Sequence, residues 1–268
     1  MDDSESLIPH DVSRIKQVFV ALWIAAIVTS PLIVPYFMAL NAIADHPRPL
    51  PAFWLPLILL RAAVVGAVVI PLGLWLSAKV GLGAPYLEHR LYGTPAPAPS
   101  RSIVGPAVFW AVATALIAFA IDAIFYYGLG VNHPAPEIHA RIPGVSPWAG
   151  LLASFGAPID EEVTYRLFLT SLIAWVVLLA SGRVGRPAAL WIANVVSAVM
   201  FGWAHMGGVE IFGPAPALAW LRTFLVILAP GLAFGWLFIK RGLEAAILSH
   251  FVIDIIVHVI RPLVDPGA

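Results

Sequence analysis

The sequence predicts an all-α membrane protein: a bundle of about seven transmembrane helices in a single domain over residues 1–268. Hydrophobic residues make up 60% of the chain and charged residues 11%, and the mean hydropathy is +0.91. Charged residues make up about a quarter of a typical soluble domain, so this composition indicates a chain embedded in lipid. Helices are expected because an open strand cannot satisfy its backbone hydrogen bonds in a bilayer.

Seven apolar stretches are long enough to cross a bilayer, which takes about 20 residues in a helix. We expect these spans at about 17–43, 53–80, 103–130, 148–180, 187–207, 215–239 and 243–262. The first is too long for a signal-peptide core and lacks a small-residue cleavage site, so it should remain as a span. No length is left for a soluble catalytic domain, so any chemistry is expected inside the bundle.

Proline and glycine residues indicate where these spans are connected or interrupted. Residues 93–100 are rich in proline and predict a stiff linker between the second and third spans. Residues 130–147 form the longest polar loop. The fourth stretch is too long for a simple crossing, and we expect the segment Gly156-Ala-Pro158 to break it before a helix that starts near Ile159.

Basic residues are unequally shared between the two sets of loops, and an excess marks the cytoplasmic side. The N-terminal segment and the second, fourth and sixth connections hold Arg14, Lys16, Lys79, Arg90, Arg101, Arg183, Arg186, Lys240 and Arg241. The remaining loops and the tail hold Arg48, Arg141 and Arg261. We therefore expect a multi-pass protein of the plasma or inner membrane with a cytoplasmic N-terminus and, for seven spans, an external C-terminus.

Several classes of function are excluded by what the chain lacks. Acidic and basic residues balance at 15 each, which gives no indication of nucleic-acid binding. The absence of cysteine excludes disulfides, thiolate metal sites and a cysteine nucleophile. The chain has no His-Glu-x-x-His zinc motif and no Gly-x-Ser-x-Gly nucleophile elbow. Asp122 and Asp254 lack the Gly-x-Gly-Asp context of an aspartyl dyad.

Three polar clusters interrupt the apolar spans. They are Glu161-Glu162-Val-Thr-Tyr-Arg166, Phe201-Gly-Trp-Ala-His205 and His250-Phe-Val-Ile-Asp254. An ionisable side chain costs at least a few kcal/mol at bilayer depth and is by default a candidate for function. The catalytic helices are therefore expected within about 148–262.

Helical geometry separates the two neighbouring glutamates. Glu162 and Arg166 are four residues apart and share a face, whereas Glu161 is turned away from it by about 100°. We expect Glu162 and Arg166 to form a buried ion pair and Glu161 to remain available as a general base. The alternative is a single neutralising network that contains all three residues.

The histidines add acid–base groups. His250 and Asp254 share a helix face, where an aspartate can orient an imidazole and set its tautomer. His205 alone is more typical of an interfacial residue, and His258 is expected to be interfacial or packed. Counting from the loops at 1.5 Å per residue places Glu161 and His205 roughly 27 to 30 Å deep, but His250 only ~14 Å deep. The clusters can therefore meet only if helices tilt, break or start deeper than the apolar stretches suggest.

Other buried polar residues have structural interpretations. Asp122 could support the site from behind, and Arg61 and Arg222 could pair with it or extend to the interface. Asn194 and Ser197 are expected to form hydrogen bonds between helices.

The three motifs, in this order on three apolar helices, resemble the CPBP family of type II CAAX prenyl endopeptidases and bacteriocin-processing or immunity proteins. The resemblance covers about 95 residues, from Glu161 to Asp254. It implies an intramembrane endopeptidase that hydrolyses a membrane-associated, in some cases prenylated, peptide or protein.

The resemblance also implies a role for each residue. Glu161 and His205 would activate a water, His250 and Asp254 would stabilise the oxyanion, and Glu162 and Arg166 would hold the site together. The family motif often ends in asparagine, and an ionised Asp254 can only accept hydrogen bonds. Asp254 could instead orient His250, act while protonated, or bind a metal.

A metal cofactor is left open by the sequence. Glu161, His205 and His250 could hold zinc or another divalent ion with one open position. The chemistry can also be written with glutamate and histidine alone, and we expect no tightly bound metal.

Two alternatives belong to other classes of function. One is a non-catalytic immunity or scaffold protein of the same fold. The other is a transporter that relays protons through Asp122, Glu161 and Asp254, although the polar clusters gather in the second half of the chain.

Overall fold

The computed structural model describes residues 12–44, 53–95, 97, 102–132 and 145–264. Within these ranges all regular elements are helical, and seven helices are long and apolar enough to cross a membrane. The all-α fold and the seven predicted spans are therefore confirmed. Half of the linker expected at 93–100 and most of the polar loop expected at 130–147 lie outside the described residues.

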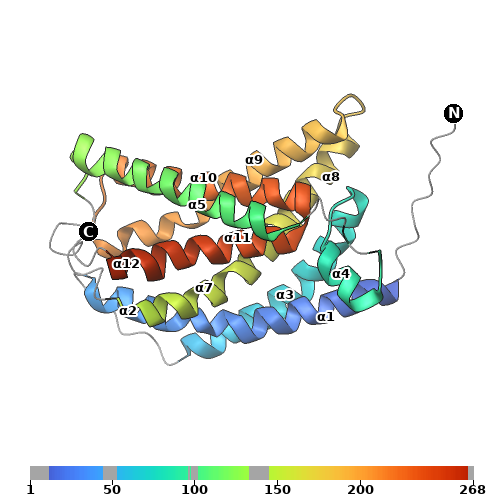
Figure 1. The fold of residues 1–268 in the computed structure, drawn as a ribbon, viewed down its shortest axis with the longest axis horizontal. Helices are drawn as coiled ribbons and strands as arrows, with labels where there is room; N and C mark the ends of the chain where they lie inside the picture. Colours follow the sequence, from blue (N-terminus) through green and yellow to red (C-terminus); the bar gives the residue numbers. More distant parts are fainter. Residues whose placement is uncertain (1–11, 45–52, 96, 98–101, 133–144, 265–268) are drawn as a thin grey trace.

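The spans combine α-helices with short 3-10 or π segments, labelled η, and lie lengthwise in one bundle (Figure 1). In chain order the elements are α1 (Val12–Thr29), η1 (Ser30–Ile33), α2 (Val34–Ile43), α3 (Trp54–Lys79), α4 (Pro85–Tyr92), α5 (Val104–Ala123), η3 (Ile124–Gly128), α7 (Pro147–Glu162), η5 (Val163–Thr170), α8 (Ser171–Ala180), α9 (Arg186–Ala204), η6 (Met206–Phe212), α10 (Ala217–Arg241), α11 (Leu243–Ile255), η7 (Ile256–Ile260) and α12 (Arg261–Val264). The start of α1 marks the end of the bundle that we call the N-side, and the end of α12 marks the opposite C-side (Figure 1).

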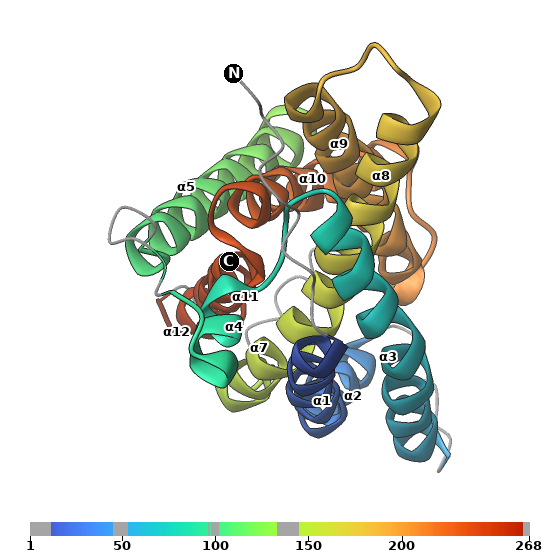
Figure 2. The same cartoon turned by 90° about the vertical axis from the view of Figure 1, so that its right-hand side faces the viewer.

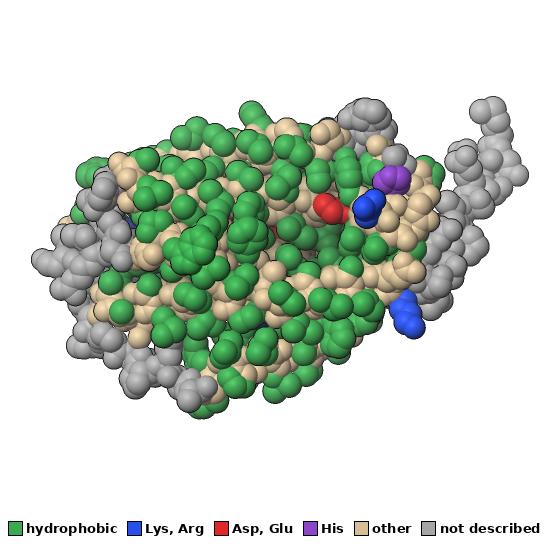
Figure 3. All heavy atoms as spheres, turned by 60° about the horizontal axis from the view of Figure 1, so that its bottom comes forward, with side chains coloured by type: hydrophobic (Ala, Val, Ile, Leu, Met, Phe, Trp, Pro, Cys, Tyr) green, Lys and Arg blue, Asp and Glu red, His purple; other side chains and the backbone are tan. Residues whose placement is uncertain are grey.

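Helix α11 lies at the centre of the packing, between α5, α7 and α10 (Figure 2). The core around it contains large apolar side chains that are almost inaccessible to solvent, such as Leu167, Phe234, Phe238 and Leu243. The outer surface is also apolar, and the face in Figure 3 shows few charged side chains, which lie towards one end. Such a surface suits a bundle whose exterior faces lipid.

The fourth span is continuous at the point where we expected a break. Helix α7 runs through Pro158 to Glu162, so the expectation of a break at Gly156-Ala-Pro158 is wrong. Gly156 instead permits close approach, because a Cβ atom at this position would lie 2.9 Å from the backbone nitrogen of Ile33. Proline inside a membrane helix is tolerated where neighbouring groups satisfy the backbone carbonyl that it leaves without a hydrogen bond. The irregular part of this span is the π segment η5, which follows α7.

Segment η5 is held by hydroxyl groups from two elements. The carbonyl of Tyr165 accepts hydrogen bonds from Thr170 Oγ1 at 2.9 Å and from Ser197 Oγ of α9 at 2.7 Å. Asn194 of α9 donates to the carbonyl of Leu232 in α10 at 3.1 Å. The predicted interhelical roles of Asn194 and Ser197 are confirmed.

Helix α4 was not expected from the hydropathy pattern, because it is short and polar. It begins with Pro85 and ends before Gly93, which has a φ of 63° that favours glycine. The helix covers the turn between α10 and α11: Leu243 N–H donates to the carbonyl of Gly83 at 3.0 Å, and Leu87 N–H donates to Glu244 Oε1 at 2.7 Å. Helix α11 therefore starts beneath α4.

Gly150 provides a test of how tightly α7 packs on the end of the seventh span. A Cβ atom at this position would collide with the carbonyl group of His258. We expect Gly150→Ala to lower the free energy of unfolding by ~1–3 kcal/mol, as overpacking typically does. The measurement is thermal unfolding of purified protein in detergent.

Gly105→Ala is the matched control, because a Cβ atom at this position would have no other atom within 4 Å. Alanine should leave α5 unchanged or slightly more stable, since it favours a helix over glycine. Equal stability of the two variants would contradict the close packing of α7 on η7.

Candidate active site

The three polar clusters meet at one point in the bundle. Glu161 lies at the end of α7, His205 directly follows α9, and His250 lies in α11. Glu161 Oε2 is 3.9 Å from His205 Nε2 and 3.8 Å from His250 Nε2. The convergence that the motifs required is present in the fold.

Unequal helix lengths explain how residues of different predicted depth come together. Helices α8 and α9 extend further towards the N-side than the α10–α11 turn does (Figure 1). That turn is covered by α4, so the eighth residue of α11, His250, lies level with residues far along α7 and α9. A helix that starts deeper was one of the three solutions allowed by the sequence.

A buried ion pair lies behind the two histidines. Arg166 Nε is 3.2 Å from Glu162 Oε2, and their side chains are 1% and 0% exposed. Arg166 Nη2 also donates to the carbonyl of Gly231 in α10 at 2.9 Å. The predicted i, i+4 pair is therefore formed, and Glu161 stands apart from it as expected.

Glu162 has a second partner that the sequence did not indicate. Its Oε1 atom is 2.8 Å from His250 Nδ1. A carboxylate that is paired with an arginine can only accept hydrogen bonds, so Nδ1 carries the proton and donates. Glu162 therefore fixes the ring of His250 and leaves Nε2 facing Glu161.

Two phenylalanines complete this arrangement. Phe234 of α10 stacks on the His250 ring with a centroid distance of 4.6 Å and an interplanar angle of 16°. The Arg166 guanidinium lies over Phe201 at 4.5 Å and over Phe234 at 5.3 Å. Phe201 belongs to the second motif, whereas no local pattern distinguishes Phe234 from other apolar residues. The rings exclude water from the ion pair and restrict the imidazole.

His205 is oriented by its own helix. Its Nδ1 atom is 2.8 Å from the carbonyl of Phe201, which can only accept, so Nδ1 carries a proton. The other nitrogen, Nε2, is directed towards Glu161. Both histidines thus present Nε2 to the same carboxylate oxygen, and that oxygen has no hydrogen-bond partner among the described residues.

Asp254 contributes charge but no hydrogen bond to His250. Its Oδ1 atom is 3.7 Å from His250 Nε2, beyond hydrogen-bond distance. Glu162 therefore orients the ring and sets its tautomer, which is the role that the sequence analysis considered for Asp254. Asp254 can still balance a positive charge on the imidazole at this distance.

A cavity of about 700 Å³ ends at Glu161 and His205. Its walls are mainly apolar side chains of η1, α2 and α3, with Tyr165 beside the glutamate. Arg61 and Asp160 also line it and form an ion pair with Nη1 and Oδ2 2.8 Å apart. The side chains of Glu161 and His205 are 25% and 33% exposed, so both are accessible from the cavity.

The metal candidates do not form a metal site. No group of three or more His, Asp or Glu side chains in the described ranges is arranged to hold an ion. Glu161, His205 and His250 do meet, with Glu161 Oε2 3.9 Å from His205 Nε2 and 3.8 Å from His250 Nε2. The site is therefore interpreted through its own carboxylates and imidazoles.

The other buried charges lie elsewhere. Asp122 pairs with Arg222 and Arg261 and lines a separate cavity, so it does not support the site. Arg61 pairs with Asp160 rather than with Asp122. Tyr36 contacts His258, with its hydroxyl 2.9 Å from Nδ1, which confirms a packing role for this histidine.

Comparisons with known proteins support the resemblance seen in the motifs. Residues 143–256 match the family model described as Type II CAAX prenyl endopeptidase Rce1-like. The sporulation-killing factor biosynthesis protein SkfC of Bacillus subtilis (strain 168) is 28% identical over 155 residues, which cover 56% of this chain and 28% of SkfC. No solved structure matches the chain. The predicted resemblance to the CPBP family is confirmed, and the matched region contains all three motifs.

The ion pair gives a prediction about stability. Arg166→Ala would leave the Glu162 carboxylate buried without its cation, and removing one partner of such a pair typically costs ~3–5 kcal/mol. We expect this variant to unfold at a much lower temperature in detergent, or to express poorly.

The double variant Glu162→Gln with Arg166→Met is the matched control. No charge remains to be paired, and the glutamine carbonyl can still accept from His250 Nδ1, so much of the stability should return. A stable Arg166→Ala protein that fails only in substrate binding would show that Arg166 recognises a substrate carboxylate instead.

Proposed function

We propose that this protein is an intramembrane endopeptidase in which Glu161 activates a water for attack on a peptide carbonyl. The observation that carries the proposal is the Glu161 carboxylate oxygen, unpaired and facing the Nε2 atoms of two oriented histidines at the end of a large apolar cavity. The Rce1-like match supports CAAX-type protease activity in general.

The geometry suggests how the water is held. Glu161 Oε2 and His205 Nε2 are two acceptors 3.9 Å apart, and a water between them can donate one proton to each. Glu161 takes a proton as the water oxygen attacks the carbonyl carbon. When the tetrahedral intermediate collapses, the same proton passes to the leaving amine.

His250 is suited to stabilise the oxyanion. It lies among three carboxylates, those of Glu162 at 2.8 Å, Asp254 at 3.7 Å and Glu161 at 3.8 Å. In its doubly protonated form it donates Nε2–H to the developing negative charge, while Nδ1–H stays on Glu162. Asp254 balances the imidazolium charge, so an aspartate can serve where the family motif often has asparagine.

The cavity favours an apolar substrate segment. Phe37, Trp54, Leu57 and Ile58 are among its lining residues, and this apolar wall suits the side chains of a membrane-associated peptide or an attached lipid. The relative SkfC carries a name that refers to the biosynthesis of a sporulation-killing factor. We therefore include small membrane-associated leader peptides as well as CAAX-type peptides among the substrates to be tested.

From the distribution of basic residues between the loops we also propose a cytoplasmic N-terminus.

A purely structural role fits the site less well. A polar network retained only for stability is expected to satisfy its buried hydrogen-bonding atoms. The Glu162 carboxylate has Arg166 Nε at 3.2 Å and His250 Nδ1 at 2.8 Å, whereas Glu161 Oε2 comes no closer than 3.8 Å to the histidines that face it. A phenotype that survives Glu161→Gln combined with His250→Ala would nevertheless favour the scaffold alternative.

The central prediction is that Glu161→Gln folds normally and loses activity. Glutamine keeps the shape but cannot accept the proton of the water, and general base catalysis typically contributes 10²- to 10⁴-fold. The measurement is cleavage of CAAX-type and leader peptides by purified protein in liposomes, together with a comparison of membrane proteomes that contain active or variant protein.

Glu88→Gln is the control for this change. Glu88 lies in α4, where its Oε1 accepts a hydrogen bond from Ala84 N–H, and a glutamine oxygen can replace it. This variant should retain full activity. Unchanged cleavage by Glu161→Gln would rule out the proposed mechanism.

A second prediction concerns metal dependence. The proposed mechanism uses only carboxylate and imidazole groups, so incubation with EDTA or 1,10-phenanthroline should leave the cleavage rate unchanged. Loss of activity that is restored by added zinc would show that Glu161, His205 and His250 rearrange around an ion.

A further inference from the structure

A second cavity, of about 360 Å³, lies on the C-side of the bundle. It is formed by α5 with η3, by α10, and by η7 with α12. None of its lining residues also lines the cavity at Glu161. The proposed peptidase mechanism leaves this cavity without a role.

Its polar groups carry an excess of positive charge. Arg222 Nε is 3.6 Å from Asp122 Oδ1, and Arg261 Nη1 is 3.4 Å from Asp122 Oδ2. The lining thus contains two guanidinium groups and one carboxylate. An uncompensated charge is costly in a membrane protein, so these residues favour the binding of a further anion.

Hydrogen-bond donors are also in excess. Each guanidinium offers five N–H groups, and one carboxylate accepts only a few of them. Arg222 Nε is buried and has no hydrogen-bond partner among the described residues. Two arginines held side by side by one aspartate are suited to a phosphate group, which takes paired N–H donors.

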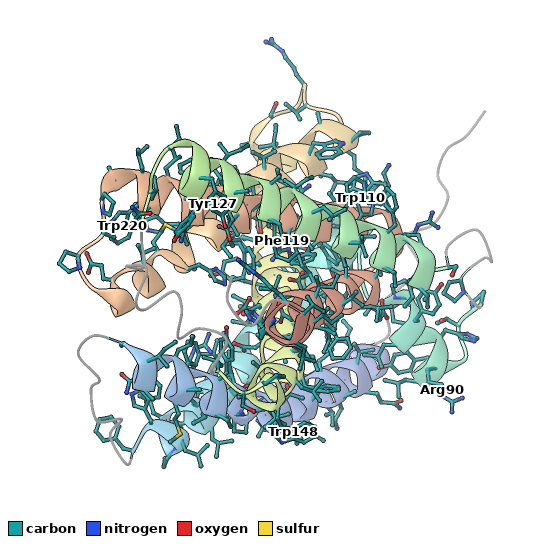
Figure 4. All side chains as sticks on the ribbon, turned by 60° about the vertical axis from the view of Figure 1, so that its left-hand side comes forward. Arg90, Trp110, Phe119, Tyr127, Trp148 and Trp220 are labelled. Atoms are coloured by element: carbon teal, nitrogen blue, oxygen red, sulfur yellow. The ribbon has the colours of Figure 1, made fainter. Side chains whose placement is uncertain are left out.

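The cavity lies at the depth of the lipid headgroups. Asp122 is six residues before the end of η3, and Arg222 is five residues after the start of α10, or roughly 8 to 9 Å along each helix. Tyr127, which is 80% exposed, and Trp220 lie towards the same end of the molecule, opposite Arg90 (Figure 4). Tyrosine and tryptophan are enriched at this level of a membrane.

Apart from Tyr126 and Tyr127, the rest of the lining is apolar, and two of its members, Ile260 and Val264, are exposed. Phe119, Ile256 and Ile260 line the cavity next to the arginines, and the Arg261 guanidinium lies over the Phe119 ring at 5.2 Å. Val264 at the rim is 74% exposed. A ligand with an anionic head and a hydrocarbon tail fits both parts of the cavity, whereas a free ion uses only one.

We propose that this cavity binds an anionic phospholipid of the C-side leaflet, with its phosphate between Arg222 and Arg261 and its acyl chain along Phe119, Ile256 and Ile260. The bound lipid joins α5, α10 and the end of the helix that carries His250. The proposal does not depend on peptidase activity.

The test is lipid binding by full-length purified protein, followed by native mass spectrometry and thermal unfolding. Phosphatidylglycerol should bind and raise the unfolding temperature more than phosphatidylcholine with the same acyl chains. Arg222→Gln and Arg261→Gln should each weaken phosphatidylglycerol binding about fivefold, the usual effect of one basic residue near an anionic lipid. Arg90→Gln, on the opposite side, should leave it unchanged.

Asp122→Asn gives the discriminating result and removes no cation. It frees both arginines for the lipid, so phosphatidylglycerol should bind about fivefold more tightly, whereas a merely structural aspartate would give weaker binding. Equal binding of the two lipids, or tight binding retained by the double arginine variant, would overturn the proposal. Stabilisation by inorganic phosphate alone, matching that by phosphatidylglycerol, would identify a free-anion site and also overturn it.

Discussion

The arrangement of the site depends on the Glu162 carboxylate, which is fully buried in the bundle. One oxygen faces Arg166 and the other accepts from His250, and Arg166 in turn donates to the carbonyl of Gly231. A charge in this environment is tolerated only when it is paired and hydrogen-bonded. This single requirement therefore connects the fourth span to α10 and α11 and fixes the imidazole of His250, whose Nε2 atom faces Glu161.

The adjacent residues Glu161 and Glu162 have different surroundings because a helix turns each residue about 100° from the last. Glu162 points into the packed core, whereas Glu161 lines the cavity. In the proposed mechanism Glu162 provides stability and orientation, and Glu161 activates the water. His250 is the contact between them, since one ring nitrogen lies against each glutamate.

Much of the fold follows from local sequence. Apolar length predicted the seven spans, because a helix is the simplest structure that satisfies its own backbone in lipid. The rule that residues four apart share a face predicted the pair of Glu162 and Arg166. The break expected at Pro158 did not occur: α7 stays helical through it, and Gly156 packs closely against η1. Helix α4 was missed, since a short polar helix has no hydropathy signal.

By itself, the sequence determined which ionisable residues lie within apolar spans and that they belong to three membrane helices. Only the tertiary structure decided that Glu162, rather than Asp254, hydrogen-bonds to His250, and that Phe234 stacks on the ring. These contacts depend on how far α11 is set beneath α4 and on its rotation against α7 and α10. Such offsets arise from close packing between elements distant in the chain, for which a local pattern carries no information.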